Sequence, residues 1–346
     1  MTAAILQTLS LVAYRGITDL ALERLTPISL VVGDNNAGKS SILEAAALVL
    51  RPPDPGQWVQ VARNRDIDMA LVDGLWGMFP GGAALQLEDG PQQSQPMKLA
   101  ARLDGKERAV TAQCLASQRW DVSNDDSEVM LRVTLEIDGQ GPQAMEFGKS
   151  PTAWAQRVTV FRAFTVTPLT HRSTRTLVEH LSRAVDEGKK PLAIHLLQLF
   201  DPAVEDIEVS TSLGREAIRV THAVRGIVDL SSFGDGMRRA AALALAITRA
   251  THGVVLVDEI EAGIHHSVLR RVLSSLFAAA AESQVQILAT THSLEAVDAI
   301  IAAAEAVGVD DSLSAYYLKR LNGQPDIRRY DHGKLRRLRE GGLDIR

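Results

Sequence analysis

Cysteine is nearly absent from this sequence, and aromatic side chains are scarce. The 346 residues include a single cysteine, Cys114, and aromatic residues make up 4% of the chain. One cysteine cannot form a disulfide within the chain or build a cysteine-rich metal site, which suits a reducing cytosol. So few aromatic rings also argue against a surface that stacks the bases of single-stranded nucleic acid.

Long apolar runs and an excess of one charge are missing as well. No run approaches the roughly 20 apolar residues that a membrane helix needs. Residues 1–14 lack the charged start and the cleavage site of a signal peptide. The formal net charge of −5 gives no global attraction to nucleic acid or to an anionic membrane. We therefore expect a cytoplasmic, globular protein with no membrane partner.

Strand and helix patterns alternate towards the two ends of the chain. The predicted strands there lie at residues 3–14, 27–32, 253–257 and 285–290. The predicted helices lie at residues 40–50, 236–250, 267–281 and 294–306. Such alternation is typical of a parallel sheet covered by helices, so the fold class expected is α/β.

The middle of the chain has a different character. Residues 97–110 contain Asp104-Gly105 between apolar runs, which predicts a hairpin, and residues 129–137 alternate as a half-buried strand does. Further predicted elements are a strand at residues 157–165, helical structure at 174–200 and β-structure at 207–220. Residues 51–96 give no clear pattern. The middle therefore predicts a β-rich lobe followed by a small helical insertion.

Residues 33–40 read Gly-Asp-Asn-Asn-Ala-Gly-Lys-Ser, the P-loop pattern, between a predicted strand and a predicted helix. Glycines let main-chain amides converge on phosphates, and the helix N-terminus favours negative charge. Lys39 is expected to bridge the β- and γ-phosphates, and the Ser40 hydroxyl to bind Mg²⁺. The nucleotide-binding residues predicted here are Asn35, Asn36, Ala37, Gly38, Lys39, Ser40 and Ser41. No guanine-reading Asn/Thr-Lys-x-Asp sequence occurs, so ATP is favoured over GTP.

A second acidic centre follows the apolar run at residues 254–257. Asp258 and Glu259 end that run in a Walker B arrangement, and a parallel sheet would bring them beside the P-loop. Asp258 is expected to hold Mg²⁺ directly or through water, and Glu259 to act as general base for the attacking water. His292 ends the next predicted strand, where it could sense the γ-phosphate. The predicted catalytic pair is therefore Glu259 and His292.

The order of these motifs resembles the head of an ABC-type ATPase. Residues 231–239, Ser-Ser-Phe-Gly-Asp-Gly-Met-Arg-Arg, resemble the Ser-x-Gly-x-Gly-x-x-Arg variant of the signature loop, and residues 261–265 follow Walker B as the D-loop does. Thr-Thr-His-Ser-Leu-Glu at residues 290–295 and Tyr-Arg-Gly-Ile at residues 14–17 narrow the likeness. The chain is similar to stand-alone prokaryotic AAA-family ATPases grouped with the SMC, RecF and OLD families.

The resemblance implies a single P-loop NTPase head over residues 1–346. Its core would comprise residues 1–50 and 225–346, its β-rich lobe residues 51–170, and its helical insertion with a β segment residues 171–224. Tyr14 and Arg15 would contact the nucleotide of their own chain. The signature residues implied to close over the nucleotide of a second copy are Ser232, Gly234, Asp235 and Gly236. A head-to-tail homodimer around two Mg-ATP is the assembly expected.

The sequence also departs from the family pattern. The segment at residues 174–200 is too short for a long coiled-coil arm, and too few residues follow His292 for a Toprim nuclease domain. Gln113 and Gln156 lie in the interval where a Q-loop glutamine is expected, but neither stands at a predicted strand end. Arg238 or Arg239 could stabilise the transition state or neutralise the dimer interface, and the sequence leaves both roles open.

Two hypotheses on the biological role remain. The first is a switch that regulates a separate effector protein, such as a nuclease, as phage-defence members of the family do. The alternative is a RecF-like DNA-repair ATPase that binds duplex DNA directly. Basic residues between 328 and 339 fit DNA or an acidic partner, although a solvated face is the commoner explanation. A transporter subunit is disfavoured because the signature is not Leu-Ser-Gly-Gly-Gln. His265-His266 are better explained as part of the D-loop than as a metal site.

Overall fold

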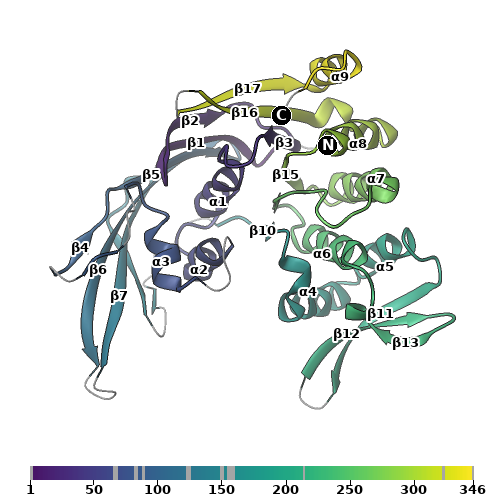
Figure 1. Ribbon diagram of the computed structural model, residues 1–346, viewed down its shortest axis with the longest axis horizontal. Helices are drawn as coiled ribbons and strands as arrows, with labels where there is room; N and C mark the ends of the chain where they lie inside the picture. The colour runs from purple at the N-terminus through teal and green to yellow at the C-terminus, as the bar shows by residue number, and fades with distance from the viewer. Residues whose placement is uncertain are drawn as a thin grey trace.

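The computed structural model describes residues 3–64, 69–81, 85–87, 90–121, 126–148, 152–153, 160–212, 215–321 and 324–344. These residues form an antiparallel sheet on one side of the molecule and a parallel sheet with covering helices on the other (Figure 1). A third, three-stranded sheet flanks the helices. The α/β class predicted from the sequence is confirmed.

The parallel sheet has the strand order β10-β14-β15-β3-β16-β17. In that order the strands are Ala163–Val166, Val254–Val257, Gln286–Thr291, Ile28–Gly33, Leu313–Leu321 and Gln324–Asp331. The first five run parallel, and β17 returns antiparallel to β16. Every residue of β3, β14 and β15 is buried, as expected for strands covered on both faces. Because parallel strands end at one edge, the loops after β3, β10, β14 and β15 meet there.

Helices cover one face of this sheet, where they share a large apolar core with it. They are α4 (Thr174–Asp186), α5 (Pro191–Gln198), α6 (Asp235–Arg249), α7 (His266–Glu282) and α8 (Leu294–Ala306). The small sheet packs beside α4 and α5 and consists of β11 (Val204–Ser212), β12 (Arg215–His222) and β13 (Gly226–Asp229). Helix α9 (His332–Glu340) packs on β16 and β17. Short 3-10 turns occur at Thr170–Arg172, Leu230–Ser232 and Asp310–Ser312.

The antiparallel sheet has the strand order β2-β1-β5-β6-β7-β8-β9, with β4 (Gln92–Gln93) paired to β6. In that order the strands are Ile17–Leu22, Leu6–Tyr14, Met97–Leu103, Lys106–Asp121, Asp126–Ile137, Gln143–Phe147 and Thr152–Ala153. The predicted hairpin is present: Asp104 and Gly105 both have positive φ between β5 and β6. The alternation in β7 is also confirmed, because Leu131, Val133, Leu135 and Ile137 are buried.

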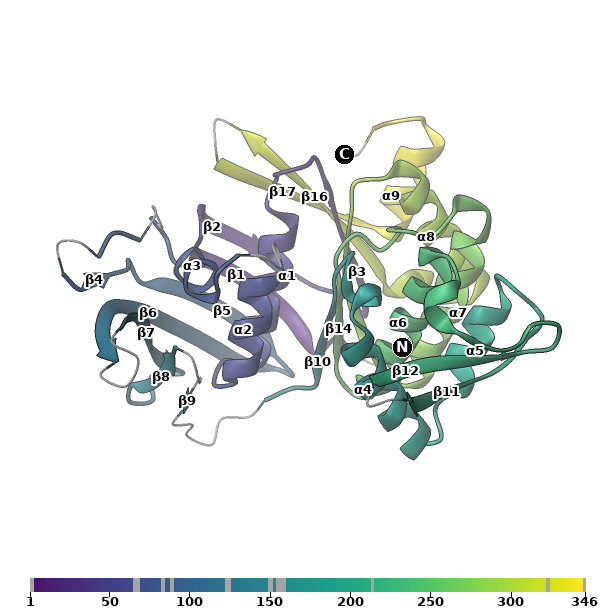
Figure 2. The ribbon, with the colours of Figure 1, turned by 60° about the horizontal axis from the view of Figure 1, so that its bottom comes forward.

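Helix α1 (Lys39–Leu50) lies between the antiparallel sheet and the parallel strands (Figure 2). All its residues except Ser40 are buried, and they join a core that contains residues of both sheets. A helix that is buried on every side has apolar residues on every side, which explains the run of alanine, leucine and valine in α1. The P-loop at its N-terminus is therefore supported from two sides.

The structure differs from the sequence predictions in three places. Two helices, α2 (Pro55–Arg63) and α3 (Leu71–Trp76), lie in the stretch that gave no pattern. The segment at 174–200 divides into α4 and α5, because Gly188 has φ of 68° and Pro191 restarts the helix. Strands β1 and β2 join the antiparallel sheet, so the β-rich part of the molecule begins before residue 51. Among the described residues, no helix is both long and apolar enough to cross a bilayer.

Candidate functional site

The P-loop needs glycine at two points for different reasons. A Cβ on Gly33 would lie 2.2 Å from the carbonyl oxygen of Leu318, so strand β16 leaves no room for a side chain. Gly38 has φ of 111°, a left-handed conformation that residues with a Cβ rarely adopt. Asn36 also has a positive φ, 62°, which asparagine tolerates better than most residues. These constraints hold the tight turn that leads into α1.

Lys39 places a cation over this loop. Its Nζ donates hydrogen bonds to the carbonyls of Gly33 at 2.7 Å and Asp34 at 2.8 Å. Burial lowers the pKa of the Lys39 ammonium, and the negative charges of Asp258 and Glu259 act against that shift. Helix α1 has no side-chain cap and no acidic residue in its first turn, so its first amides face the loop uncapped. Amides, helix dipole and ammonium together suit a phosphate group.

A cleft of about 810 Å³ opens at the loop, within the range of roughly 300–1,000 Å³ typical of ligand pockets. Predicted site residues that line it are Arg15, Asn35, Asn36, Gly38, Lys39, Ser40, Ser41, Asp258 and Glu259. The other lining residues are Gly16, Ile17, Leu43, Glu44, Asn64, Thr165, Thr167, Pro168, Leu169 and Arg320. Ala37 is buried and does not line the cleft. The P-loop and the Walker B carboxylates therefore share one cavity.

Asp258 and Ser40 meet although 218 residues separate them. The Ser40 hydroxyl donates to Asp258 Oδ2 at 2.8 Å, and the hydroxyl of the buried Thr290 donates to Asp258 Oδ1 at 2.5 Å. Thr290 thus fixes one carboxylate oxygen and turns the other towards the P-loop. Strands β14 and β15 are adjacent and parallel, which is what brings Asp258 and Thr290 together.

The Ser40–Asp258 pair fits Mg²⁺. Mg²⁺ binds oxygen atoms at about 2.0–2.1 Å in an octahedron, so neighbouring ligands lie about 2.9 Å apart. The observed 2.8 Å separation matches that spacing. Among the described residues, no group of three His, Cys, Asp or Glu side chains could hold a metal. The donors present therefore suit an ion that completes its shell with phosphate oxygens and water.

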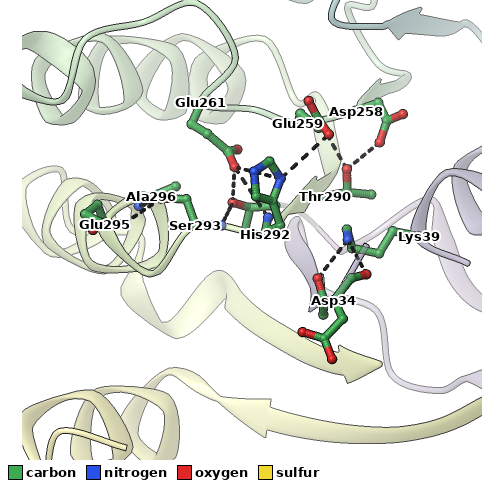
Figure 3. A network of polar contacts seen from close by, with 12 residues as sticks. Asp34, Lys39, Asp258, Glu259, Glu261, Thr290, His292, Ser293, Glu295 and Ala296 are labelled. Atoms are coloured by element: carbon green, nitrogen blue, oxygen red, sulfur yellow. Dashed lines mark hydrogen bonds and ion pairs between the residues drawn. The ribbon is translucent and has the colours of Figure 1, made fainter. Parts of the chain in front are cut away.

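Glu259 and His292 lie next to each other at the same sheet edge (Figure 3). His292 Nδ1 is 3.6 Å from Glu259 Oε1 and 3.7 Å from Glu261 Oε1. Glu259 has φ of 47°, and its N–H donates to the Thr290 hydroxyl at 2.9 Å. The left-handed backbone at a non-glycine residue turns this carboxylate away from the direction of β14 and towards the cleft that it lines.

The signature residues lie elsewhere. Ser232, Gly234, Asp235 and Gly236 do not line the cleft. The Ser232 hydroxyl donates to the carbonyl of Asp229 at 2.7 Å, and Asp235 accepts from Arg172 at 2.9 Å. A Cβ on Gly236 would lie 2.7 Å from the carbonyl oxygen of Gly263, so this glycine allows α6 to touch the predicted D-loop. The structure therefore brings the signature loop to the D-loop and not to the P-loop of the same chain.

Arg239 is fully buried one turn into α6. Its guanidinium donates to the carbonyls of Thr167, Asp258 and Glu259, with 2.8 Å to Asp258 and 3.2 Å to Glu259. Burial lowers its pKa to about 10. Arg238 instead bonds Asp235 and the carbonyl of His171. The sequence left two roles open for Arg238 or Arg239, namely transition-state stabilisation and neutralisation of a dimer interface. Because Arg239 is buried, its side chain cannot lie at an exposed interface. It joins α6 to the backbone of the Walker B turn.

Comparison with known proteins gives one family match and several relatives. Residues 150–298 match the family described as "AAA domain, putative AbiEii toxin, Type IV TA system". Uncharacterized protein MJECL11 of Methanocaldococcus jannaschii is 31% identical over 115 residues, which are 33% of this chain and 98% of that protein. The chain belongs to the family of MJECL11. Uncharacterized protein MJECL10 of the same organism is 51% identical over 45 residues, and the match spans 13% of this chain and 20% of that protein.

A solved structure shares the fold. It is the SMC head bound to the C-winged helix domain of ScpA, with a TM-score of 0.52 at 12% identity, covering 95% of this chain and 98% of that chain. At this identity the likeness concerns the fold. Together with the AAA-domain match, it shows that the chain has the P-loop ATPase fold found in SMC heads.

Of the two predicted residues near the start of the chain, Tyr14 lies in the core and Arg15 lies at the cleft. Tyr14 is fully buried and donates to Glu44 Oε2 at 3.0 Å, so it does not reach the cleft. Burial and the Glu44 charge raise the Tyr14 pKa well above its usual value. Arg15 does line the cleft, and its Nε is 2.7 Å from Glu44 Oε2. Tyr14 is the last residue of β1, whereas Arg15 lies in the turn after it with φ of 52°, so only one of the two predicted residues lines the cleft.

Two threonines, and not Gln113, line the cleft where strand β10 ends. Gln113 lies in β6 of the antiparallel sheet, where its side chain donates to the carbonyl of Ser94 at 3.0 Å, and Gln156 lies outside the described residues. The strand that ends beside Walker B is β10, and Thr165 and Thr167 follow its course into the cleft. A threonine after a short strand carries no motif, so only the strand pairing reveals these residues.

Proposed function

We propose that this chain binds Mg-ATP in the cleft at the P-loop and hydrolyses it. The contact that carries this proposal is the Ser40–Asp258 pair at 2.8 Å, which joins the P-loop to the Walker B strand. Lys39 and the first amides of α1 would neutralise the β- and γ-phosphates. Ser40 and Asp258 would hold Mg²⁺, which supplies further positive charge to the phosphate oxygens when bound.

Glu259 is the proposed general base. Its carboxylate lines the cleft, where it would accept a proton from the attacking water. The new bond forms between the water oxygen and the γ-phosphorus, while the bond to the bridging oxygen breaks and ADP leaves with that electron pair. His292, 3.6 Å from Glu259, would orient this carboxylate and contact the γ-phosphate. Thr290 holds the Glu259 backbone and Asp258 with a single hydroxyl.

We further propose that two copies pair head-to-tail around two Mg-ATP. The signature residues Ser232 to Gly236 do not line the cleft of their own chain, and the Ser232 side chain is exposed. A glycine-rich helix start with its amides accessible is suited to a phosphate, which a second copy would present. ATP held by both copies favours the closed dimer, and loss of the γ-phosphate reopens it.

The switch so formed would regulate a separate effector, such as a nuclease in phage defence. The family description, which names a toxin of a type IV toxin–antitoxin system, supports a defence role. A turnover rate that rises with duplex DNA and falls steeply with salt would instead favour a RecF-like DNA-repair ATPase. Purification of the native complex with Mg-ATP would show which partner is bound.

Lys39→Ala tests the ATP site. Removing the buried ammonium takes away a side-chain cation that bonds two carbonyls of the loop. Mg-ATP binding should therefore fall by at least about 100-fold, the loss of a strong charge-assisted contact in a partly buried site. Isothermal titration calorimetry measures the dissociation constant. Arg270→Ala, an exposed change on α7, should bind as the wild type does. Equal affinity in Lys39→Ala would overturn the assignment of the cleft.

A further inference from the structure

Arg320 lies near the end of β16, on the face of the strand that looks into the cleft. Alternate residues of a strand share a face. Tyr316 and Leu318 belong to the core around α1, whereas Leu313 and Ala315 belong to the core beneath the covering helices. Arg320 continues the first of these faces and lines the cleft, while the neighbouring Lys319 does not line it.

The register of β16 places Arg320 beside the first half of the P-loop. Leu318 pairs with Gly33, and its carbonyl closes against that glycine. Because β16 runs parallel to β3, Arg320 lies two residues beyond the pair, level with the turn that follows Gly33. Strand β3 has β16 on one side and β15 on the other, and β15 separates it from β14, which carries Asp258. Arg320 therefore borders the loop from the side opposite the Walker B carboxylates.

The guanidinium N–H groups of Arg320 have no bonding partner among the described residues. Arg15, the other arginine in the cleft, is bonded to Glu44 and to the carbonyl of Gly77 at 2.8 Å. Lys39 is bonded to two loop carbonyls. Arg320 is exposed, and no hydrogen bond or ion pair joins its side chain to any other residue in the described part of the chain. Its guanidinium can therefore meet an anion without first breaking an internal contact.

We infer that Arg320 binds the α-phosphate and nucleoside end of ATP. Asp258 and Glu259 mark where the γ-phosphate lies in the proposed reaction, so the opposite side of the loop receives the other end of the nucleotide. An arginine there donates charge-assisted hydrogen bonds to phosphate or ribose oxygens. The inference rests on the proposed ATP site and adds a binding residue that lies outside all the motifs.

The test compares Mg-ATP and Mg-ADP, which share the α-phosphate and nucleoside but differ at the γ-phosphate. Arg320→Ala should weaken binding of both nucleotides by the same factor, about tenfold or more, as expected for lost hydrogen bonds to a charged group. Arg320→Lys should retain part of the affinity, since it keeps the charge. Lys319→Ala is the matched control and should change either dissociation constant by less than about threefold.

Two results would overturn the inference. Unchanged affinity of Arg320→Ala for both nucleotides would show that the side chain does not bind the ligand. A loss confined to ATP would move the contact to the γ-phosphate and contradict the placement. Lys39→Ala in the same titration separates these outcomes from failure of the ATP site itself: if that variant loses affinity while Arg320→Ala does not, only the role of Arg320 is rejected.

Discussion

Two helices of this molecule, α1 and α6, begin at glycine-rich loops. In the proposal, the α1 loop binds the nucleotide of its own chain and the α6 loop contacts the nucleotide of a second copy. Gly38 and Gly234 are the N-cap residues of α1 and α6, and neither helix has a side-chain hydrogen bond at its N-cap. By contrast, α4, α8 and α9 are capped by Ser173, Ser293 and Asp331. An uncapped helix start leaves amides available to a ligand, so both loops are suited to phosphate.

The surroundings of the two starts differ. The α1 start lies in a cleft with a lysine, a hydroxyl and two carboxylates within reach. The α6 start has Asp235 in its first turn, bonded to His171, Arg172 and Arg238, and no cleft of its own chain includes it among the described pockets. The first loop therefore has all the groups that the proposed nucleotide site uses. In the proposal the second loop contacts a partner's nucleotide, so affinity and dimerisation should be separable by mutation.

The largest effect should come from Glu259→Gln. The α1 loop keeps its cation and its Mg²⁺ ligands, so Mg-ATP still binds, but turnover should fall by about 10²- to 10⁴-fold without the base. The trapped nucleotide should then hold the α6 loop of a second copy, and dimer should accumulate. Phosphate release and light scattering after size-exclusion chromatography measure the two effects. Wild-type turnover in this variant would reject the role of Glu259.

Ser232→Arg should break the α6 loop alone. A bulky cation at this exposed position obstructs a partner's nucleotide, so the ATP-dependent dimer should be lost. The dissociation constant of the monomer for Mg-ATP should change by less than about threefold, because the site is remote from the cleft. Sedimentation with and without Mg-ATP reports the dimer, and Thr211→Arg, at an exposed position of β11, is a control that also replaces a hydroxyl residue by arginine. An undiminished dimer would show that the second loop plays no part in pairing.

Arg239→Met should produce the smallest change and sharpen the link between the loops. Three carbonyls, one of them from Glu259, would lose the hydrogen bond from the guanidinium, which should lower the free energy of unfolding by about 1–3 kcal/mol. As a positioning residue, Arg239 should affect kcat more than KM. Chemical denaturation and steady-state kinetics measure both, with Arg270→Met as the exposed control. Equal loss in kcat and affinity would point to a purely structural role.

The sequence predicted the motifs well because each depends on local chemistry. The glycines of residues 33–40 and the apolar run before Asp258 announce a loop and a buried strand without knowledge of their neighbours. The parallel sheet followed from the alternation of strand and helix. Tyr14 shows the limit: the family resemblance implied a ligand contact, whereas its hydroxyl donates to Glu44 inside the core.

Residues that enter the site through strand pairing could not be found this way. Thr165 is an ordinary strand residue, and Thr290 opens the motif at residues 290–295 without a predicted role. Only the adjacency of β10, β14 and β15 makes them part of the cleft or of its support. Arg320 depends on the pairing of β16 with β3, some 285 residues apart for Ser29 and Ser314. Membership of β1 in the antiparallel sheet is likewise a property of long-range pairing, not of its own residues.

Helix α1 also affects how genetic variation in this chain should be read. Helix α1 is buried against both sheets, so the antiparallel sheet helps to hold the phosphate loop in place although it does not carry the carboxylates. A substitution in the apolar face of β1, β5 or β6 can therefore lower nucleotide affinity without touching a ligand or a partner. A mutational screen for interaction surfaces should therefore give little weight to substitutions on the buried face of this sheet and more weight to substitutions on its exposed face.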